Sequence, residues 1–152
     1  MTGTLPGLQR IGFVRSVRIP RFADIISHEV LCKSVLNKLP DSAALPFQYT
    51  VNSYDGCSHG CRYCFELLSR ECLDCNCGND LDTQVVVKTN VADVFCRELR
   101  PPWWWHETVA LGANTDPYQG AESHYALIPG ITSAFVGSVT PLSILTKAAL
   151  LR

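Results

Sequence analysis

Residues 47–64 read FQYTVNSYDGCSHGCRYC and combine a strand-like run with a group of thiols. Over residues 47–52 apolar or aromatic side chains alternate with polar ones, which is the pattern of a half-buried β-strand. Thiolates are the usual protein ligands of iron–sulfur clusters, and Gly56 and Gly60 allow the backbone tight turns around one. The stretch therefore predicts a strand that delivers a cluster-binding loop, with the ligands Cys57, Cys61 and Cys64.

The spacing of these thiols leaves a four-iron cluster one protein ligand short. No cysteine follows Cys64 closely enough to complete the set within the same loop. An open coordination position is where chemistry is expected, by the logic that separates catalytic from structural zinc sites. The loop therefore predicts a reactive cluster.

The Cys-x3-Cys-x2-Cys spacing, with an aromatic residue between the last two cysteines, resembles the signature of radical S-adenosylmethionine (SAM) enzymes. Five stretches are similar to the spore photoproduct lyase-like branch, whose members are often labelled DNA repair photolyases: residues 49–52, 56–61, 87–90, 114–119 and 145–147. The resemblance runs from about Leu5 to the last residue. It implies an α/β fold, the N-terminal portion of a partial (β/α)6 radical SAM barrel, truncated after about three β/α units. It also implies an N-terminal lead segment at 1–46 and an incomplete radical SAM core at 47–152.

The resemblance also implies a site and its cofactors. The three cysteines would hold a [4Fe-4S] cluster, whose open iron would bind the amino and carboxylate groups of SAM. An external one-electron reductant would drive cleavage of SAM to a 5′-deoxyadenosyl radical, which abstracts hydrogen from a substrate. The implied SAM contacts are Tyr63 at the adenine, Lys147 at the methionyl carboxylate, and, at the methionyl amino group, Asn114, Thr115 and Asp116.

The order of the strands agrees with this placement. Residues 108–113 and 142–147 are strand-like runs that end in polar residues, and polar residues at the carboxyl ends of parallel strands line the site in β/α barrels. No catalytic side chain is assignable. The substrate is not derivable either, and nucleic acid enters as a substrate only by analogy.

The chain is short for a catalytically active member of this family. A complete radical SAM core has six β/α units by resemblance, so the substrate half would be missing and the last strand would expose an unpaired edge. Three departures agree with a degraded or truncated member: Asp55 where the branch usually has a basic residue, Ala113 where it favours Thr, and the additional cysteines. We therefore expect no activity from this chain alone unless another chain supplies the rest.

Composition bounds the class of protein. The 152 residues predict one domain, and 13 basic against 14 acidic residues give a net charge of −1, which favours neither nucleic acid nor membrane. The N-terminus lacks the features of a secretory signal, and no apolar run reaches membrane-spanning length. Eight cysteines then indicate metal or redox chemistry in a reducing cytoplasm.

Two competing classes remain. A non-catalytic metal or iron–sulfur binding module fits the cysteines but leaves residues 114–119 and Lys147 without a role. A disulfide-stapled secreted domain lacks a signal. A second group of thiols either binds an auxiliary metal or is incidental, and its members are Cys72, Cys75 and Cys77.

Other segments give weaker predictions. Residues 1–21 form an irregular lead whose arginines are a solvated surface or a phosphate-contacting strip. Residues 22–46 suit a strand or a helical turn equally. Residues 84–88 predict a strand, Asn90 caps a helix that stops before Pro101, and a second helix runs from about 129 to 137. Residues 103–106, three tryptophans and a histidine, form a covering loop or an aromatic platform. Cys32 and Cys96 are expected to pack.

Overall fold

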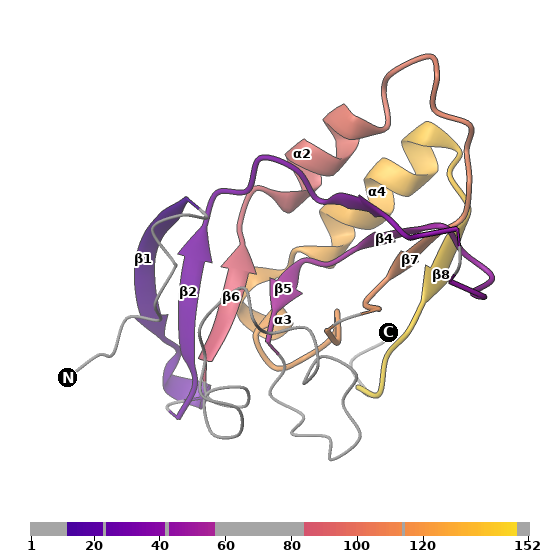
Figure 1. The fold of residues 1–152 in the computed structure, drawn as a ribbon. Coiled ribbons are helices and arrows are strands. Elements are labelled where there is room, and N and C mark those ends of the chain that lie inside the picture. Colours follow the sequence, from indigo (N-terminus) through magenta and orange to yellow (C-terminus); the bar gives the residue numbers. More distant parts are fainter. Residues whose placement is uncertain (1–11, 23, 42, 57–83, 114, 149–152) are drawn as a thin grey trace.

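Two four-stranded sheets organise the chain in a computed structural model, which describes residues 12–22, 24–41, 43–56, 84–113 and 115–148 (Figure 1). The N-terminal sheet has the strand order β1-β2-β6-β5. Its strands are β1 (Phe13–Arg18), β2 (Ile26–Val30), β5 (Tyr54–Asp55) and β6 (Gln84–Lys88). Only the β2–β6 pair is parallel, since β1 and β5 run antiparallel to their neighbours.

The C-terminal sheet has the order β3-β4-β7-β8. Its strands are β3 (Leu36–Lys38), β4 (Tyr49–Val51), β7 (Val109–Leu111) and β8 (Leu142–Ile144). The strands β4, β7 and β8 are parallel, with Val51 opposite Leu111 and Leu111 opposite Ile144, whereas β3 runs antiparallel at one edge. The carboxyl ends of three parallel strands therefore lie in register.

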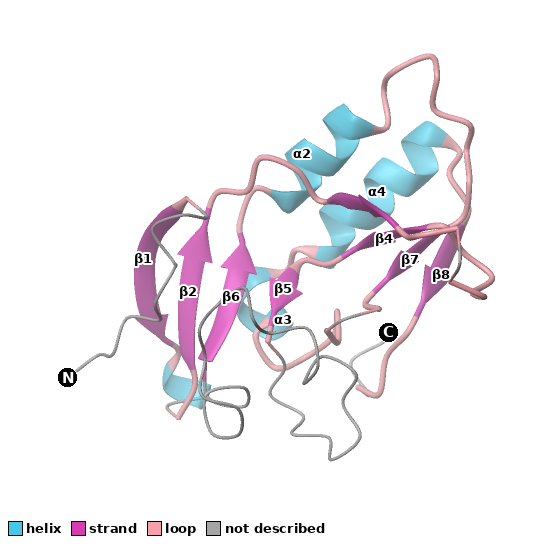
Figure 2. Ribbon diagram, in the orientation of Figure 1, coloured by secondary structure: helices cyan, strands magenta, loops and turns pink. Residues whose placement is uncertain are grey.

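Helices cover one face of the C-terminal sheet (Figure 2). The covering helices are α2 (Val91–Glu98) and α4 (Ile128–Ser138). The described chain also has the short 3-10 helix η2 (Pro20–Phe22) and the helix α3 (Glu122–Tyr125). The apolar side chains of α2 recur at helical spacing and pack with those of α4, and Phe95 meets Phe135 at a ring-centroid distance of 4.9 Å. Both helices bury this face against the valines and leucines of β4 and β7, which makes the main core.

The prediction of a partial (β/α)6 barrel truncated after about three β/α units is wrong. A barrel needs one continuous sheet of parallel strands, each followed by a helix. Within the described residues there are instead two small mixed sheets and three α-helices. Only Asn52 and Ser53 separate β4 from β5, and there the chain passes from one sheet to the other. Hydrophobic period does not encode strand direction, so apolar runs alone did not reveal the split.

One further local prediction is wrong and another holds only in part. The lead at 1–21 contains β1, a strand that pairs antiparallel with β2 and has a register shift between Phe13 and Arg15. Asn90 is the N-cap residue of α2 as predicted, and its carbonyl accepts a hydrogen bond from the backbone N of Val94 (3.1 Å), but its side chain does not cap the helix. Its amide instead accepts a hydrogen bond from the backbone N of Cys32 (2.9 Å) and donates one to the carbonyl of Cys32 (2.9 Å). Asn90 therefore fastens the end of β2 to the start of α2.

Other local predictions are confirmed. The strands β4, β6, β7 and β8 lie within the runs that were predicted to be strands. The helix α2 ends at Glu98, before Pro101, as expected. The ambiguous segment at 22–46 holds two strands, β2 and β3. Glu98 helps to place β3, because its carboxylate accepts the backbone N–H groups of Val35 (3.0 Å) and Leu36 (2.9 Å).

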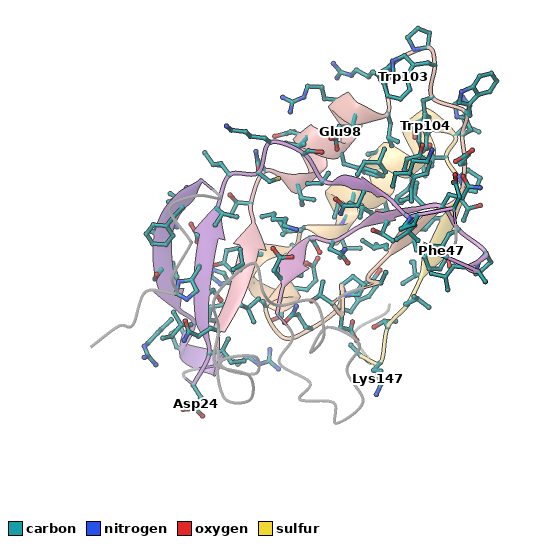
Figure 3. The ribbon with its side chains drawn as sticks, viewed as in Figure 1. Asp24, Phe47, Glu98, Trp103, Trp104 and Lys147 are labelled. Atoms are coloured by element: carbon teal, nitrogen blue, oxygen red, sulfur yellow. The ribbon has the colours of Figure 1, made fainter. Side chains whose placement is uncertain are left out.

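The three consecutive tryptophans divide between core and surface. Trp104 is buried, packs edge-on against Tyr49 and donates from Nε1 to Thr140 Oγ1 at 2.9 Å. Trp103 and Trp105 are 64% and 83% exposed. The loop between α2 and β7 is thus anchored by its middle tryptophan (Figure 3). Among the described helices, none has the length and apolar character needed to cross a membrane.

Candidate functional site

The carboxyl ends of β4, β7 and β8 bring three polar segments to one edge of the C-terminal sheet. These segments are residues 52–56, residues 112–113 with 115–119, and residues 145–147. The turn after β7 is tight. Gly112 has a φ of +88°, and a Cβ there would lie 2.4 Å from Pro117 Cδ and 2.7 Å from the carbonyl oxygen of Leu145. Glycine at 112 therefore lets the loops after β7 and β8 approach each other.

Asp116 joins the loops after β7 and β8. Its carboxylate accepts hydrogen bonds from Thr146 Oγ1 (2.6 Å), the backbone N of Lys147 (2.7 Å) and the backbone N of Tyr118 (2.9 Å). The residue is 8% exposed. Hydrogen bonds to a carboxylate are about twice as strong as neutral ones, so Asp116 holds the two strand ends together.

Thr115 and Gln119 both bind the carbonyl oxygen of Gly56. Thr115 Oγ1 donates to it at 2.7 Å, Gln119 Nε2 donates at 3.0 Å, and Gln119 Nε2 also lies 3.1 Å from Thr115 Oγ1. Both side chains are buried, at 5% and 0% exposed. The loop after β7 thereby binds the backbone carbonyl of Gly56, the residue that precedes Cys57 in the sequence.

The two residues before Gly56 are also held. Asp55 pairs with Lys88 (3.1 Å between Nζ and Oδ1), and Lys88 Nζ also donates to the carbonyl of Asn52 at 3.2 Å. Asp55, which stands where the branch usually has a basic residue, is thus paired with Lys88 in this fold. The Tyr54 hydroxyl donates to Glu122 Oε2 at 2.5 Å, and burial is the main cause that raises the pKa of Tyr54.

Glu122 connects this region to the helices. Besides the Tyr54 hydroxyl, its carboxylate accepts the backbone N–H groups of Leu127 (3.1 Å) and Ile128 (2.8 Å). These donors belong to the N-cap residue and the first residue of α4, where N–H groups lack helical acceptors. One buried carboxylate therefore ties the start of α4 to β5.

The predicted site residues divide into those that the structure describes and those that it does not. Thr115, Asp116 and Lys147 lie together at the strand ends, and Lys147 is exposed with its side chain directed away from the strands (Figure 3). The polar atoms of Thr115 and Asp116 bind other parts of the chain. Outside the described residues lie the cluster ligands Cys57, Cys61 and Cys64, the SAM contacts Tyr63 and Asn114, and the second thiol group Cys72, Cys75 and Cys77.

Two described thiols behave as expected for packing residues. Cys32 and Cys96 are half-buried and not in disulfides. Burial raises the pKa of Cys32, and its Sγ donates to Asn90 Oδ1 at 3.1 Å. No group of three or more potential metal ligands occurs within the part of the chain that the structure describes.

The residues that sequence patterns missed are Gln119, Lys88 and Glu122. Each acts across at least 33 positions of sequence, on Gly56, Asp55 and Tyr54 respectively. Gln119 and Lys88 lie in stretches that resemble the family, but their spacing carried no signal of what they would contact. Glu122 had no signal at all.

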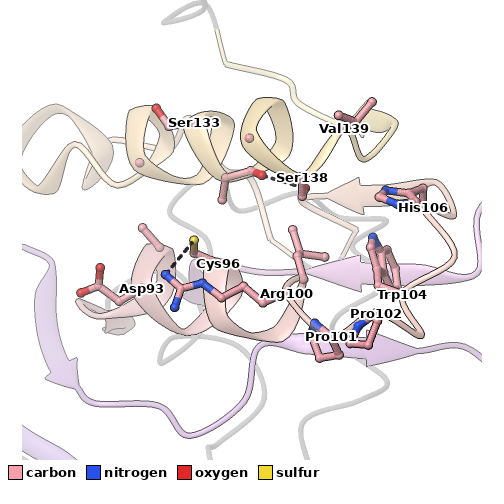
Figure 4. Close-up of a pocket in the computed structure, with 15 residues that line it drawn as sticks. Asp93, Cys96, Arg100, Pro101, Pro102, Trp104, His106, Ser133, Ser138 and Val139 are labelled. Atoms are coloured by element: carbon pink, nitrogen blue, oxygen red, sulfur yellow. Dashed lines mark hydrogen bonds between the residues drawn. The ribbon is translucent and has the colours of Figure 1, made fainter.

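A separate cleft of about 780 Å³ lies between α2 and α4 (Figure 4). Small residues of both helices line it, including Ala92, Gly130 and Ser133, and Trp104 and His106 also line it. None of its lining residues belongs to the three strand-end segments. The strand-end site and the interhelical cleft are therefore different features.

Comparisons place the chain near three mycobacterial sequences. Proteins from Mycobacterium bovis and from two strains of Mycobacterium tuberculosis, each described as uncharacterized, are 69% identical to it over 150 residues. The match covers 99% of this chain and 44% of each relative, so the chain spans less than half the length of these relatives. No protein-family model and no solved structure matches the chain.

Proposed function

We propose that the chain is an iron–sulfur-cluster-binding radical SAM protein, similar to the spore photoproduct lyase-like branch. The proposed ligands of a [4Fe-4S] cluster are Cys57, Cys61 and Cys64. The observation that carries the proposal is the convergence of strand ends. Gly56, which directly precedes the first thiol in the sequence, is bound through its carbonyl by the loop after β7, and that loop is tied to the loop after β8.

The donor chemistry of this chain fits such a cluster. Three thiolates within eight residues are a ligand set for iron and sulfide, and they leave one iron open. When bound, the cluster would supply an electron for reductive cleavage of SAM, generating a 5′-deoxyadenosyl radical. Thiolate ligands suit a reducing compartment, which favours the cytoplasm.

The chain's own residues would supply position. The Lys147 ammonium, at the end of β8, has the charge that a methionyl carboxylate needs. Tyr63 and Asn114 remain predicted contacts, as do Thr115 and Asp116. An external one-electron reductant is the proposed partner. Nucleic acid enters as a substrate only by analogy with the family.

A second candidate is a non-catalytic iron–sulfur or metal binding module. It is favoured by the contacts of Thr115 and Asp116, whose side chains hold Gly56, Thr146 and the backbone of Lys147 together. In that case these residues would support the cluster loop without binding SAM.

Anaerobic reconstitution tests both candidates. We expect the chain to take up about four iron and four sulfide ions, the content of the cluster type. Substituting alanine at Cys57, Cys61 and Cys64 should abolish uptake. The matched control, alanine at Cys72, Cys75 and Cys77, should leave it unchanged. Reduced metal content in the control would instead reveal an auxiliary site.

The response to SAM then separates the two functions. For a radical SAM protein, SAM should change the electron paramagnetic resonance spectrum of the reduced cluster. Formation of 5′-deoxyadenosine under reductant would in addition overturn the expectation that this chain alone is inactive. A cluster whose spectrum ignores SAM selects the binding module. A chain that takes up neither a cluster nor another metal ion rejects both.

A further inference from the structure

Residues 54–56, called here the pre-loop segment, are held from three different elements. Tyr54 is bound by Glu122 of α3 (2.5 Å), and Asp55 is bound by Lys88 of β6 (3.1 Å). Gly56 is bound by the loop after β7. Three successive residues are therefore each held by a side chain from a distant part of the sequence, and these contacts fix the path of the backbone over residues 54–56.

The Gly56 carbonyl is the last backbone acceptor before Cys57. A carbonyl oxygen has two lone pairs, and Thr115 Oγ1 (2.7 Å) and Gln119 Nε2 (3.0 Å) supply two donors to it. Gly56 has a φ of +93°, a left-handed backbone conformation that glycine adopts without strain. The backbone at Gly56 is therefore fixed both by its conformation and by two buried hydrogen bonds to its carbonyl oxygen.

We propose that Thr115 and Gln119 are positioning residues for the Cys57 thiolate, acting through the Gly56 carbonyl. This inference rests on the proposed function, because it takes Cys57 as a cluster ligand. It goes beyond the resemblance, which places Thr115 at the amino group of SAM and gives Gln119 no role. Groups that orient a metal ligand without touching the metal commonly change metal affinity by about 10- to 100-fold when they are removed.

The variants separate positioning from general stability. Thr115→Val removes the hydroxyl at nearly constant volume, Gln119→Met removes the amide donor, and Thr115→Ser restores a hydroxyl. The matched control is Thr140→Val. Thr140 is likewise buried, at 6% exposed, and its Oγ1 accepts a hydrogen bond from Trp104 Nε1 at 2.9 Å, away from the pre-loop segment.

Two measurements apply to the full chain. Amide hydrogen exchange of a peptide covering residues 54–56 is followed without cluster. The rate of iron release to a chelator is followed after reconstitution, at a fixed interval below the melting temperature of each variant. We expect Thr115→Val and Gln119→Met to accelerate both, with iron release rising about tenfold or more. Thr115→Ser should restore wild-type rates, and Thr140→Val should change neither.

Three results would overturn the proposal. Wild-type exchange and iron release in both Thr115→Val and Gln119→Met would show that the contacts do not orient the ligand. Iron release as fast in Thr140→Val would reduce the effect to general stability. Wild-type iron release with at least a tenfold loss of SAM affinity in Thr115→Val would make Thr115 a SAM contact instead.

Failure of the proposed function is distinguishable from these results. A wild-type chain that takes up no iron rejects the proposed function and the positioning role together. Hydrogen exchange of residues 54–56 still reports in that case whether Thr115 and Gln119 hold the segment. Cluster uptake by the wild type with unaltered exchange and iron release in both variants rejects the positioning role alone.

Discussion

Asp116 shows how a residue expected at a cofactor can also serve the scaffold. Its carboxylate accepts three hydrogen bonds from two loops, and two of them come from the segment after β8. A carboxylate offers about four lone-pair positions, so the intramolecular contacts use most of them. Asp116 therefore sets the spacing between the ends of β7 and β8, and any contact with SAM would add to that role.

Gly112 permits this close approach, and its replacement provides a test at the same scale. Gly112→Ala should lower the free energy of unfolding by about 1–3 kcal/mol, because the added Cβ meets Pro117 and the Leu145 carbonyl at a positive φ. Urea denaturation measures the change.

The matched control for Gly112→Ala is Gly137→Ala. Gly137 lies in α4, and an added Cβ there meets no atom within 4 Å. Alanine is preferred over glycine in helices, so this variant should be more stable by up to about 1 kcal/mol. Equal losses in both variants would contradict the strain at Gly112.

At the scale of elements, a chain of side-chain contacts crosses three strands of the N-terminal sheet. His28 on β2 lies between Ser16 of β1 (2.8 Å from Nδ1) and Gln84 of β6 (2.9 Å from Nε2). The Gln84 amide oxygen only accepts, so Nε2 carries the proton and Nδ1 accepts from the Ser16 hydroxyl. A neutral imidazole therefore satisfies both neighbours, and burial lowers the pKa of His28.

This geometry predicts a pH dependence of stability. The unfolded chain binds the His28 proton more tightly than the folded chain, whose pKa lies below the ordinary 6.5. The free energy of unfolding should hold its full value above pH 6.5 and fall as the pH decreases from there toward the lowered pKa. Urea denaturation over a pH series, compared with His28→Asn, checks this, because the variant should lack the loss.

A wild-type slope equal to that of His28→Asn would contradict the prediction. Titration of Glu29 does not overlap with the pH range in which His28 affects stability. Its hydrogen bonds with Arg15 are the main cause that lowers its pKa, so its own loss of stability begins only below about 4.5. The two residues titrate in different pH windows.

At the scale of the whole molecule, the described chain forms two sheets and passes between them three times, after β2, after β4 and after β6. In the C-terminal sheet β8 is an edge strand, and among the described strands it pairs only with β7. Leu142 and Leu145 are 36% and 46% exposed beside this edge. An edge with apolar side chains is a template for association with another strand.

Charge on this edge should reduce self-association. We expect Leu142→Lys to lower concentration-dependent light scattering, because a lysine on an edge strand opposes strand addition. The control is Val136→Lys on α4, where an apolar side chain is 79% exposed away from any strand edge. The same decrease in both variants would show that exposed apolar area, and not the strand edge, drives association.

The sequence alone determined the positions of many elements. Alternation at 47–52, the β-branched run at 84–88 and the helical spacing after Asn90 predicted β4, β6 and α2, because side-chain period is a local property. The spacing of the cysteines along the sequence identified the thiols. The positions of polar residues after two apolar runs identified the polar residues after β7 and β8. The thiols lie outside the described residues, so their role stays a prediction.

Tertiary structure decided the arrangement of these elements and the partners of their side chains. Strand direction and sheet membership depend on pairing across the chain, which is why the division into two mixed sheets replaced the expected barrel. The hydrogen bonds of Thr115 and Gln119 to Gly56 join residues that are separated by 59 and 63 positions in the sequence, respectively. Such contacts depend on the packed geometry, since the spacing of residues in one segment does not specify its distant neighbours.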